Sequence, residues 1–254
     1  MRVPMRQLFF WFALCCISYM NADLPLKKRP APIHVTTSIV VPCVPIHFQY
    51  IPELLEGYTR QTVLPDEVVI SLSEGLKVNR MEMADVKDRS WPFKLLIIEN
   101  EDKTSEGTNR NIGTDHSSGD VLLYQDADDL PHPQRVEIVK YLFENYFVQH
   151  VYHGYILENN AETEPFAIYD LHALNAFYAY QHVYQVNGRN LHNGAVCFTR
   201  DVANKVRWVE GFRISTDSEF SLQVYKIIQD KVVLIDPLIL YRYHLSTYHG
   251  INKS

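Results

Sequence analysis

Short apolar runs rich in β-branched residues alternate with longer amphipathic stretches from residue 36 onwards. The runs in the first half are nearly all apolar, as expected of strands that helices cover on both faces. Strands and helices that alternate in this way form βα units, which build a parallel or mixed sheet. The pattern therefore predicts a single α/β domain with a mixed, mostly parallel central sheet flanked by helices.

The first half of the chain gives the clearest elements. We expect strands at 37–42, 67–72, 94–98 and 121–124, and helices at about 46–60, 78–89 and 103–118. Pro131 and Pro133 then open a helix that runs to about Tyr146. The less regular second half has an aromatic-rich stretch at 168–184. It predicts strands at 151–157, 194–199, 232–235 and 238–243, and helices near 201–206 and 216–229, the last with Thr216 as its N-cap.

The N-terminus has the layout of a signal peptide: Arg2 and Arg6, the apolar run 8–17, then small and polar residues. This run is short for a bilayer, which needs about 20 apolar residues. An uncleaved signal anchor and a buried helix are the alternatives. We expect a leader at 1–22, a proline-rich extended linker at 23–34, the domain at 35–246 and a tail at 247–254. Either kind of leader predicts a secretory-pathway location: the lumen, a Golgi or ER membrane to which the N-terminal segment attaches, or secretion.

Charge and cysteine content narrow the class of protein. The net charge is −6 and the sequence pI is near 6.0, with no long basic run. Because nucleic-acid-binding proteins carry a basic surface, a nucleic-acid partner is not expected. Only Cys43 and Cys197 fall in the domain, and both lie in strand-like segments. The two cysteines therefore predict buried free thiols and no disulfide framework.

Two carboxylates, Asp126 and Asp128, follow the predicted strand at 121–124. Ligands bind at the carboxyl ends of strands in open α/β sheets, because the loops there converge on a crevice. Carboxylates one residue apart can share Mg²⁺ or Mn²⁺, which commonly takes one or two carboxylates plus substrate phosphates. A pair of this kind also fits a solvated acidic turn that caps the next helix. Only the surrounding residues can distinguish a metal site from such a turn.

Those residues carry a family resemblance. Gly107-Thr108-Asn109-Arg110-Asn111-Ile112-Gly113 is followed by Ser118-Gly119-Asp120, the strand, and Gln125-Asp126-Ala127-Asp128-Asp129. This order resembles the family 2 glycosyltransferases, in which a helix with an Arg-Asn-x-Gly motif precedes a Gly-Asp strand ending in Asp-Ala-Asp-Asp. The resemblance covers about 36–244 and implies the Rossmann-like GT-A fold. It implies a metal-dependent, inverting transfer of a sugar from a nucleoside-diphosphate sugar to a hydroxyl of a glycan, glycoprotein or glycolipid.

The resemblance also implies roles for individual residues. The donor would contact Pro42, Glu74, Arg110, Asp126 and Asp128, and Mn²⁺ or Mg²⁺ would bind Asp126, Asp128 and His244. Asp217, with Glu219 as its rival, would be the base that deprotonates the acceptor. The acceptor pocket would include His192, Asn193 and Trp208. The competing interpretations are a surface ion pair for Arg110, an ordinary helix-start carboxylate for Asp217, a structural histidine for His244 and a core aromatic for Trp208.

Two departures from the family pattern keep a second class of function open. Ser73-Glu74-Gly75-Leu76 stands where the family usually shows Asp-Asp-Gly-Ser, and the Glu that usually precedes the catalytic Asp is absent before Asp217. A catalytically silent relative that binds a sugar nucleotide or a glycan is therefore the alternative. A nucleotidyltransferase is least expected, because Pro42-Cys43-Val44-Pro45 is neither glycine-rich nor basic.

Overall fold

The computed structural model describes residues 25–157, 167–179, 185–186, 189–190, 196–211, 216–228 and 231–241. The predicted leader at 1–22 and tail at 247–254 lie outside these ranges. Within them, no helix combines the length and the apolar character that crossing a bilayer requires.

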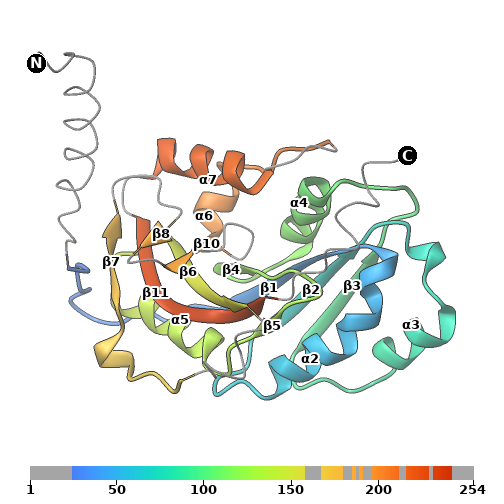
Figure 1. Ribbon diagram of the computed structural model, residues 1–254, viewed down its shortest axis with the longest axis horizontal. Coiled ribbons are helices and arrows are strands. Elements are labelled where there is room, and N and C mark those ends of the chain that lie inside the picture. Colours follow the sequence, from blue (N-terminus) through green and yellow to red (C-terminus); the bar gives the residue numbers. More distant parts are fainter. Residues whose placement is uncertain are drawn as a thin grey trace, which may run out of the picture.

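A curled mixed sheet forms the centre of the domain (Figure 1). Its strands are β1 (Thr37–Cys43), β2 (Glu67–Leu72), β3 (Lys94–Glu99), β4 (Val121–Tyr124), β5 (Leu130–Pro131), β6 (His150–Leu157), β7 (Ala176–Ala179), β10 (Cys197–Thr199) and β11 (Lys231–Tyr241). They follow the order β3-β2-β1-β4-β10-β6-β11-β5, and β7 also pairs with β11. β10, β5 and β7 run against the other strands, so the predicted mixed, mostly parallel sheet is confirmed. β8 (Gln185–Val186) and β9 (Arg189–Asn190) form a separate ladder.

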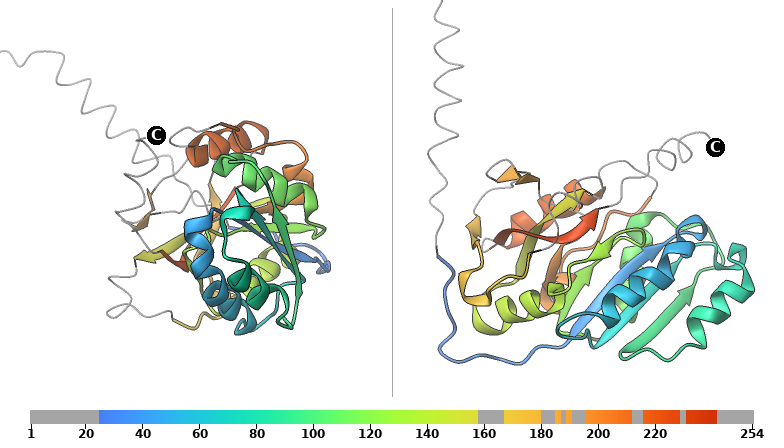
Figure 2. Two further views of the ribbon diagram at one scale, coloured as in Figure 1. Left: turned by 90° about the vertical axis from the view of Figure 1, so that its right-hand side faces the viewer. Right: turned by 60° about the horizontal axis from the view of Figure 1, so that its bottom comes forward.

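Helices cover both faces of this sheet (Figures 1 and 2). One face carries α2 (Ile51–Thr59), α3 (Arg80–Lys87) and α5 (Arg135–Asn145), and the other carries α4 (Glu106–His116), α6 (Arg200–Ala203) and α7 (Thr216–Ile227). β1 shows why successive residues at its centre are apolar. Ile39 and Val41 pack into the core beneath α2, whereas Val40 packs into the core beneath α6 and α7.

One predicted helix and two predicted strands differ from the structure in detail, and proline explains the first difference. The helix predicted at 46–60 is a 3-10 helix, η1 (Pro45–Tyr50), followed by α2, with Pro52 in the first turn of α2. Because proline lacks an N–H and clashes with the preceding turn, it starts a helix and does not sit in its interior. The strands predicted at 232–235 and 238–243 are one strand, β11. It pairs with β6 along its length and shifts register around Pro237.

Part of the predicted linker is packed on the domain. From Lys27 to Ile33 it runs along the end of α5, where the Arg29 amide donates to the Asn145 carbonyl (2.7 Å) and the Ile33 amide to the Glu144 carbonyl (3.0 Å). Thr36 then accepts a hydrogen bond from the Val121 amide, at the start of β4. The chain therefore enters the domain at the amino edge of the parallel strands, opposite the edge where β4 ends.

A buried carboxylate, Glu67, ties together segments at the same amino edge. The side chain is 3% exposed, and its Oε1 accepts from the Ser38 hydroxyl (2.6 Å) and the Ser118 amide, while its Oε2 accepts from the Lys94 ammonium group (3.1 Å). Burial opposes the charge, but these hydrogen bonds outweigh burial and lower the pKa of Glu67 to about 2. Ionised Glu67 therefore stabilises the fold.

We predict that Glu67→Gln lowers the free energy of unfolding by about 2 kcal/mol at pH 7. Since the folded-state pKa lies below the ordinary value of 4.5, the contribution of the carboxylate is complete above that value. It is lost as the pH falls from about 4.5 to about 2, so the two proteins should converge there. Urea unfolding at several pH values measures this difference. The matched control is Glu82→Gln on the exposed side of α3, and an equal effect of both substitutions would contradict the prediction.

Candidate active site

The carboxyl ends of β1, β2, β3 and β4 meet at one edge of the sheet, because these strands are parallel neighbours. Asn109, buried in α4, ties three of the strand ends together. Its Oδ1 accepts from Thr104 Oγ1 (2.6 Å), Ser71 Oγ (3.2 Å) and Asn100 Nδ2 (3.3 Å), and its Nδ2 donates to the Cys43 carbonyl (3.2 Å). The sequence placed Asn109 within the helix motif but gave it no role.

Asp126 and Asp128 lie on the loop that follows β4 at this edge. Both are partly exposed, while Ala127 and Asp129 between and beside them are buried. Asp128 also lies close to the end of β1: burial first, and then the negative charge of Asp128, raise the pKa of the Cys43 thiol. The loop thus presents two carboxylates outward from a strand end, as the sequence predicts.

Arg110, on α4, holds one of these carboxylates from inside the protein. Its side chain is fully buried, with Nη2 2.8 Å from Asp126 Oδ1 and Nη1 2.6 Å from Glu106 Oε1. The guanidinium carbon lies 4.3 Å from the centre of the Trp208 ring. The competing interpretation, an ion pair with an acidic surface neighbour, is met in part: Glu106 is 53% exposed, whereas the guanidinium itself is buried. Its predicted contact with the nucleotide stays a prediction, and the structure adds a role in orienting Asp126.

Arg135, at the start of α5, holds the same loop from the other face of the sheet. Its Nη2 donates to the Tyr124 carbonyl (2.7 Å), and its Nη1 donates to Gln125 Oε1 (2.9 Å) and the Tyr58 hydroxyl (2.7 Å). Burial raises the pKa of Tyr58 to about 12, although the charge of Arg135 lowers it, so the hydroxyl remains a donor to Gln125. Sequence analysis assigned Arg135 no role. The available signal was a cation three and four residues before the apolar Ile138 and Val139, and so on the same face of the helix.

The remaining predicted donor and catalytic residues fall at the expected ends of elements. Pro42 is buried near the end of β1. Glu74 follows β2 in a left-handed conformation (φ 50°), and its carboxylate lies 2.5 Å from the Lys77 ammonium group. Asp217 is the second residue of α7, and Glu219 is exposed on the same helix. The roles proposed for these residues stay predictions. His192, Asn193 and His244 lie outside the described residues.

Trp208 is buried and does not form an exposed surface on which an acceptor sugar could stack. Its indole is 2% exposed and stacks on the Phe220 ring at 3.8 Å between centroids and 8° between planes, with Arg110 also against it. A sugar needs an open ring face, and this conformation offers none. The structure therefore gives Trp208 the core role that the sequence had left as the competing interpretation.

The two carboxylates suit a metal only together with a substrate. Across the described ranges, no three His, Cys, Asp or Glu side chains gather into a group that could hold an ion. Asp126 and Asp128 nevertheless present hard oxygen atoms at a strand end, and Mn²⁺ or Mg²⁺ commonly binds one or two carboxylates with substrate phosphates completing its ligands. The residues present thus fit a cation that arrives with a diphosphate.

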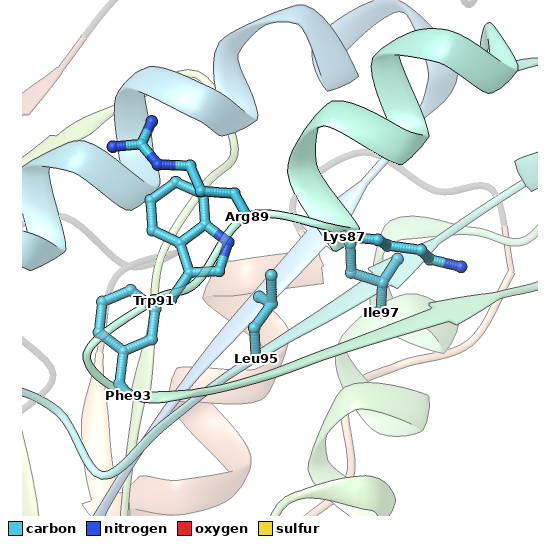
Figure 3. A pocket seen from close by; sticks show the side chains of 6 residues that line it. All are labelled: Lys87, Arg89, Trp91, Phe93, Leu95 and Ile97. Atoms are coloured by element: carbon cyan, nitrogen blue, oxygen red, sulfur yellow. The ribbon is translucent and has the colours of Figure 1, made fainter.

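A cavity of about 360 Å³ lies elsewhere, beside the edge strand β3 (Figure 3). Trp91, Phe93, Leu95 and Ile97 form its apolar lining, and Lys87 and Arg89 complete it. Lys87 already pairs with Glu99 (2.5 Å), and Arg89 contacts Glu56. The cavity includes none of the predicted donor residues, so it is a separate feature from the carboxylate loop.

Comparison with known proteins agrees with this arrangement. Residues 38–207 match the family model described as "Glycosyl transferase family 2". A Haemophilus influenzae protein described as an uncharacterized glycosyltransferase is 32% identical over 104 residues, which are 41% of this chain and 33% of that protein. The chain thus matches only a third of this relative's length.

Solved structures share the fold at low sequence identity. S. aureus TarS in complex with UDP-GlcNAc is similar with a TM-score of 0.62 and 16% identity, over 82% of this chain and 59% of that one. The mannosyltransferase PcManGT from Pyrobaculum calidifontis, in complex with GDP-Man and Mn²⁺, is similar with a TM-score of 0.59 and 17% identity, over 96% of this chain and 66% of that one. The GT-A fold is therefore confirmed, and the chain spans less than two thirds of both structures.

We predict that Arg110→Lys lowers the free energy of unfolding by about 2 kcal/mol, because an ammonium group cannot reach both Glu106 and Asp126 with the fixed geometry of a guanidinium. Urea denaturation provides the measurement. Arg207→Lys is the matched control, since Arg207 pairs with Asp115 at the exposed surface (2.6 Å) and its loss should cost less than about 1 kcal/mol. Equal midpoints for Arg110→Lys and the unsubstituted protein would refute the structural role of Arg110.

Proposed function

Because the chain belongs to glycosyl transferase family 2, we propose that it transfers a sugar from a nucleoside-diphosphate sugar to a hydroxyl group of an acceptor, with a divalent metal and with inversion at the anomeric carbon. One observation carries this proposal. Asp126 and Asp128 face outward at the carboxyl edge of the parallel strands, and a buried guanidinium holds the first of them in place. Ligands of open α/β sheets bind at that edge.

Each proposed residue has a distinct task in the transfer. Asp217 accepts the proton of the acceptor hydroxyl, whose oxygen then forms a bond to the anomeric carbon. The bond from that carbon to the diphosphate oxygen breaks, and the nucleoside diphosphate leaves. Asp126 and Asp128, and in our proposal also His244, would hold Mn²⁺ or Mg²⁺, which would supply positive charge beside the departing diphosphate. Arg110 keeps Asp126 oriented.

The docked linker bears on the acceptor and on the location of the protein. It enters at the amino edge of the sheet, whereas the carboxylate loop lies at the carboxyl edge. We propose a secretory-pathway location on the strength of the N-terminal sequence. An N-terminal anchor would then leave the donor site facing away from the bilayer, which favours a glycan or glycoprotein acceptor over a glycolipid within the same membrane.

The second candidate function is a silent relative that binds a sugar nucleotide without turnover. The Glu74 carboxylate favours it, since this residue replaces the acidic residue expected at the nucleotide but lies 2.5 Å from the Lys77 ammonium group. A carboxylate with a cationic partner of its own is less available for a nucleobase. Turnover separates the two functions.

We predict metal-dependent transfer by the full-length chain in a screen of sugar nucleotides, beginning with UDP-GlcNAc and GDP-mannose as hexosaminyl and hexosyl donors. Chelation should abolish transfer, because the charge on the leaving diphosphate is then not neutralised. Asp217→Ala should lower kcat by at least about 100-fold with donor affinity retained, since it removes only the base. Asp128→Ala should weaken metal-dependent donor binding. Product formation and donor titration provide the two readouts.

Asp201→Ala is the matched control, because this exposed carboxylate on α6 pairs with Lys205 four residues further along the chain and should leave transfer unchanged. Binding without turnover across donors and acceptors would favour the silent relative. A folded protein that binds no sugar nucleotide would exclude both functions.

A further inference from the structure

We propose that Asn111 is a positioning residue for the transfer, because it fixes the loop from Trp208 to Gly211, which packs against α7, the helix that carries the proposed base Asp217. This inference rests on the proposed function. It concerns a residue of the helix motif that has no role in the site as described so far.

The side chain of Asn111 forms hydrogen bonds with the backbone of the loop. Its Oδ1 accepts from the Trp208 amide (2.9 Å), and its Nδ2 donates to the Trp208 carbonyl (3.0 Å). The same Nδ2 lies 3.1 Å from Glu210 Oε1. Asn111 is 3% exposed, so these hydrogen bonds are shielded from water. A buried donor or acceptor without a partner costs free energy, so these hydrogen bonds keep the loop in this position.

The turn of α4 that precedes Asn111 is shaped to receive the same loop. A Cβ atom at Gly107 would lie 2.0 Å from the Val209 carbonyl oxygen, so only glycine permits this approach. Ser105, the N-cap of α4, accepts a hydrogen bond from the Gly211 amide (3.1 Å). Gly211 itself has φ +100°, a conformation that favours glycine. The loop therefore lies along the start of α4 at both of its ends.

The loop is also attached directly to α7. The Trp208 indole stacks on Phe220, which lies one helical turn beyond Asp217. Fixing the backbone of Trp208 thus fixes the ring on which the first turns of α7 rest. Removing the Asn111 side chain leaves this stack without its backbone support.

Neighbouring residues of α4 consequently hold the two halves of the proposed site. Arg110 binds Asp126 of the donor loop, and Asn111 binds the loop that leads to Asp217. One helix, α4, thereby contacts both the donor loop and the segment that packs against the helix of the proposed base. Catalysis is sensitive to the placement of reacting groups, because small displacements of these groups cost large factors in rate.

The test compares Asn111→Ala with Asp115→Asn in the full-length chain. Asp115 is the matched control because it joins the same helix to Arg207, the residue that precedes the loop, but at the exposed surface. Hydrogen exchange of 208–211 and of the first turn of α7 should accelerate at least about 10-fold in Asn111→Ala, with β1 and β4 unchanged. In the transfer assay kcat should fall at least about 10-fold, while the donor Kd changes less than about threefold. Asp115→Asn should alter each quantity less than about threefold.

Several outcomes would overturn the inference. Unchanged exchange at 208–211 and α7, faster exchange with an unchanged kcat, or a weakened donor Kd with an unchanged kcat would each do so. If Asn111→Ala fails to fold, Asn111→Asp keeps the acceptor for the Trp208 amide and loses the donor, and the same readouts apply. If the unsubstituted protein transfers no sugar, the proposed function fails, and exchange alone then decides whether Asn111 holds α7.

Discussion

The buried positive charge of Arg110 is the constraint on which the candidate site depends. A guanidinium withdrawn from water is tolerated only when carboxylates and hydrogen-bond acceptors surround it. Glu106 and Asp126 provide this balance, and the Trp208 ring covers the guanidinium. Because Asp126 belongs to the loop after β4 and Trp208 to the segment before α7, one buried charge fixes three elements relative to each other.

The donor loop is held from both faces of the sheet. Arg110 reaches it from α4, and Arg135 reaches the preceding residues from α5 through the Tyr124 carbonyl and the Gln125 side chain. Asn109 ties the ends of the neighbouring strands together beside it. Carboxylates fixed in this way need little reorganisation when a charged substrate arrives, which is the condition for electrostatic catalysis. The interior of the protein, and not the loop itself, sets the geometry of the site.

The linker and the carboxylate loop lie at opposite edges of the sheet. The linker packs along the amino edge of the parallel strands, the carboxylate loop occupies the carboxyl edge, and the cavity beside β3 lies at the outer edge of the sheet. Strand direction assigns the linker and the carboxylate loop to opposite edges, whereas strand order places the cavity beside the last strand. The left-handed Glu74, paired with Lys77, lies at a part of the carboxyl edge where the chain departs from the family pattern described above.

Local sequence patterns predicted the positions of β1 to β4 and of the carboxylate loop. Runs such as 39–41 and 68–70 are apolar at successive positions because helices cover both faces of the sheet, and this requirement is visible locally. Tertiary structure alone decided that β11 is one strand, that Trp208 is a core residue, and that Asn111 and Arg135 hold the two sides of the site. Trp208 lies 97 residues along the chain from Asn111, whose side-chain amide binds the Trp208 backbone. Local patterns report which side chains are buried, but the partner of a buried polar group is set by how distant segments pack.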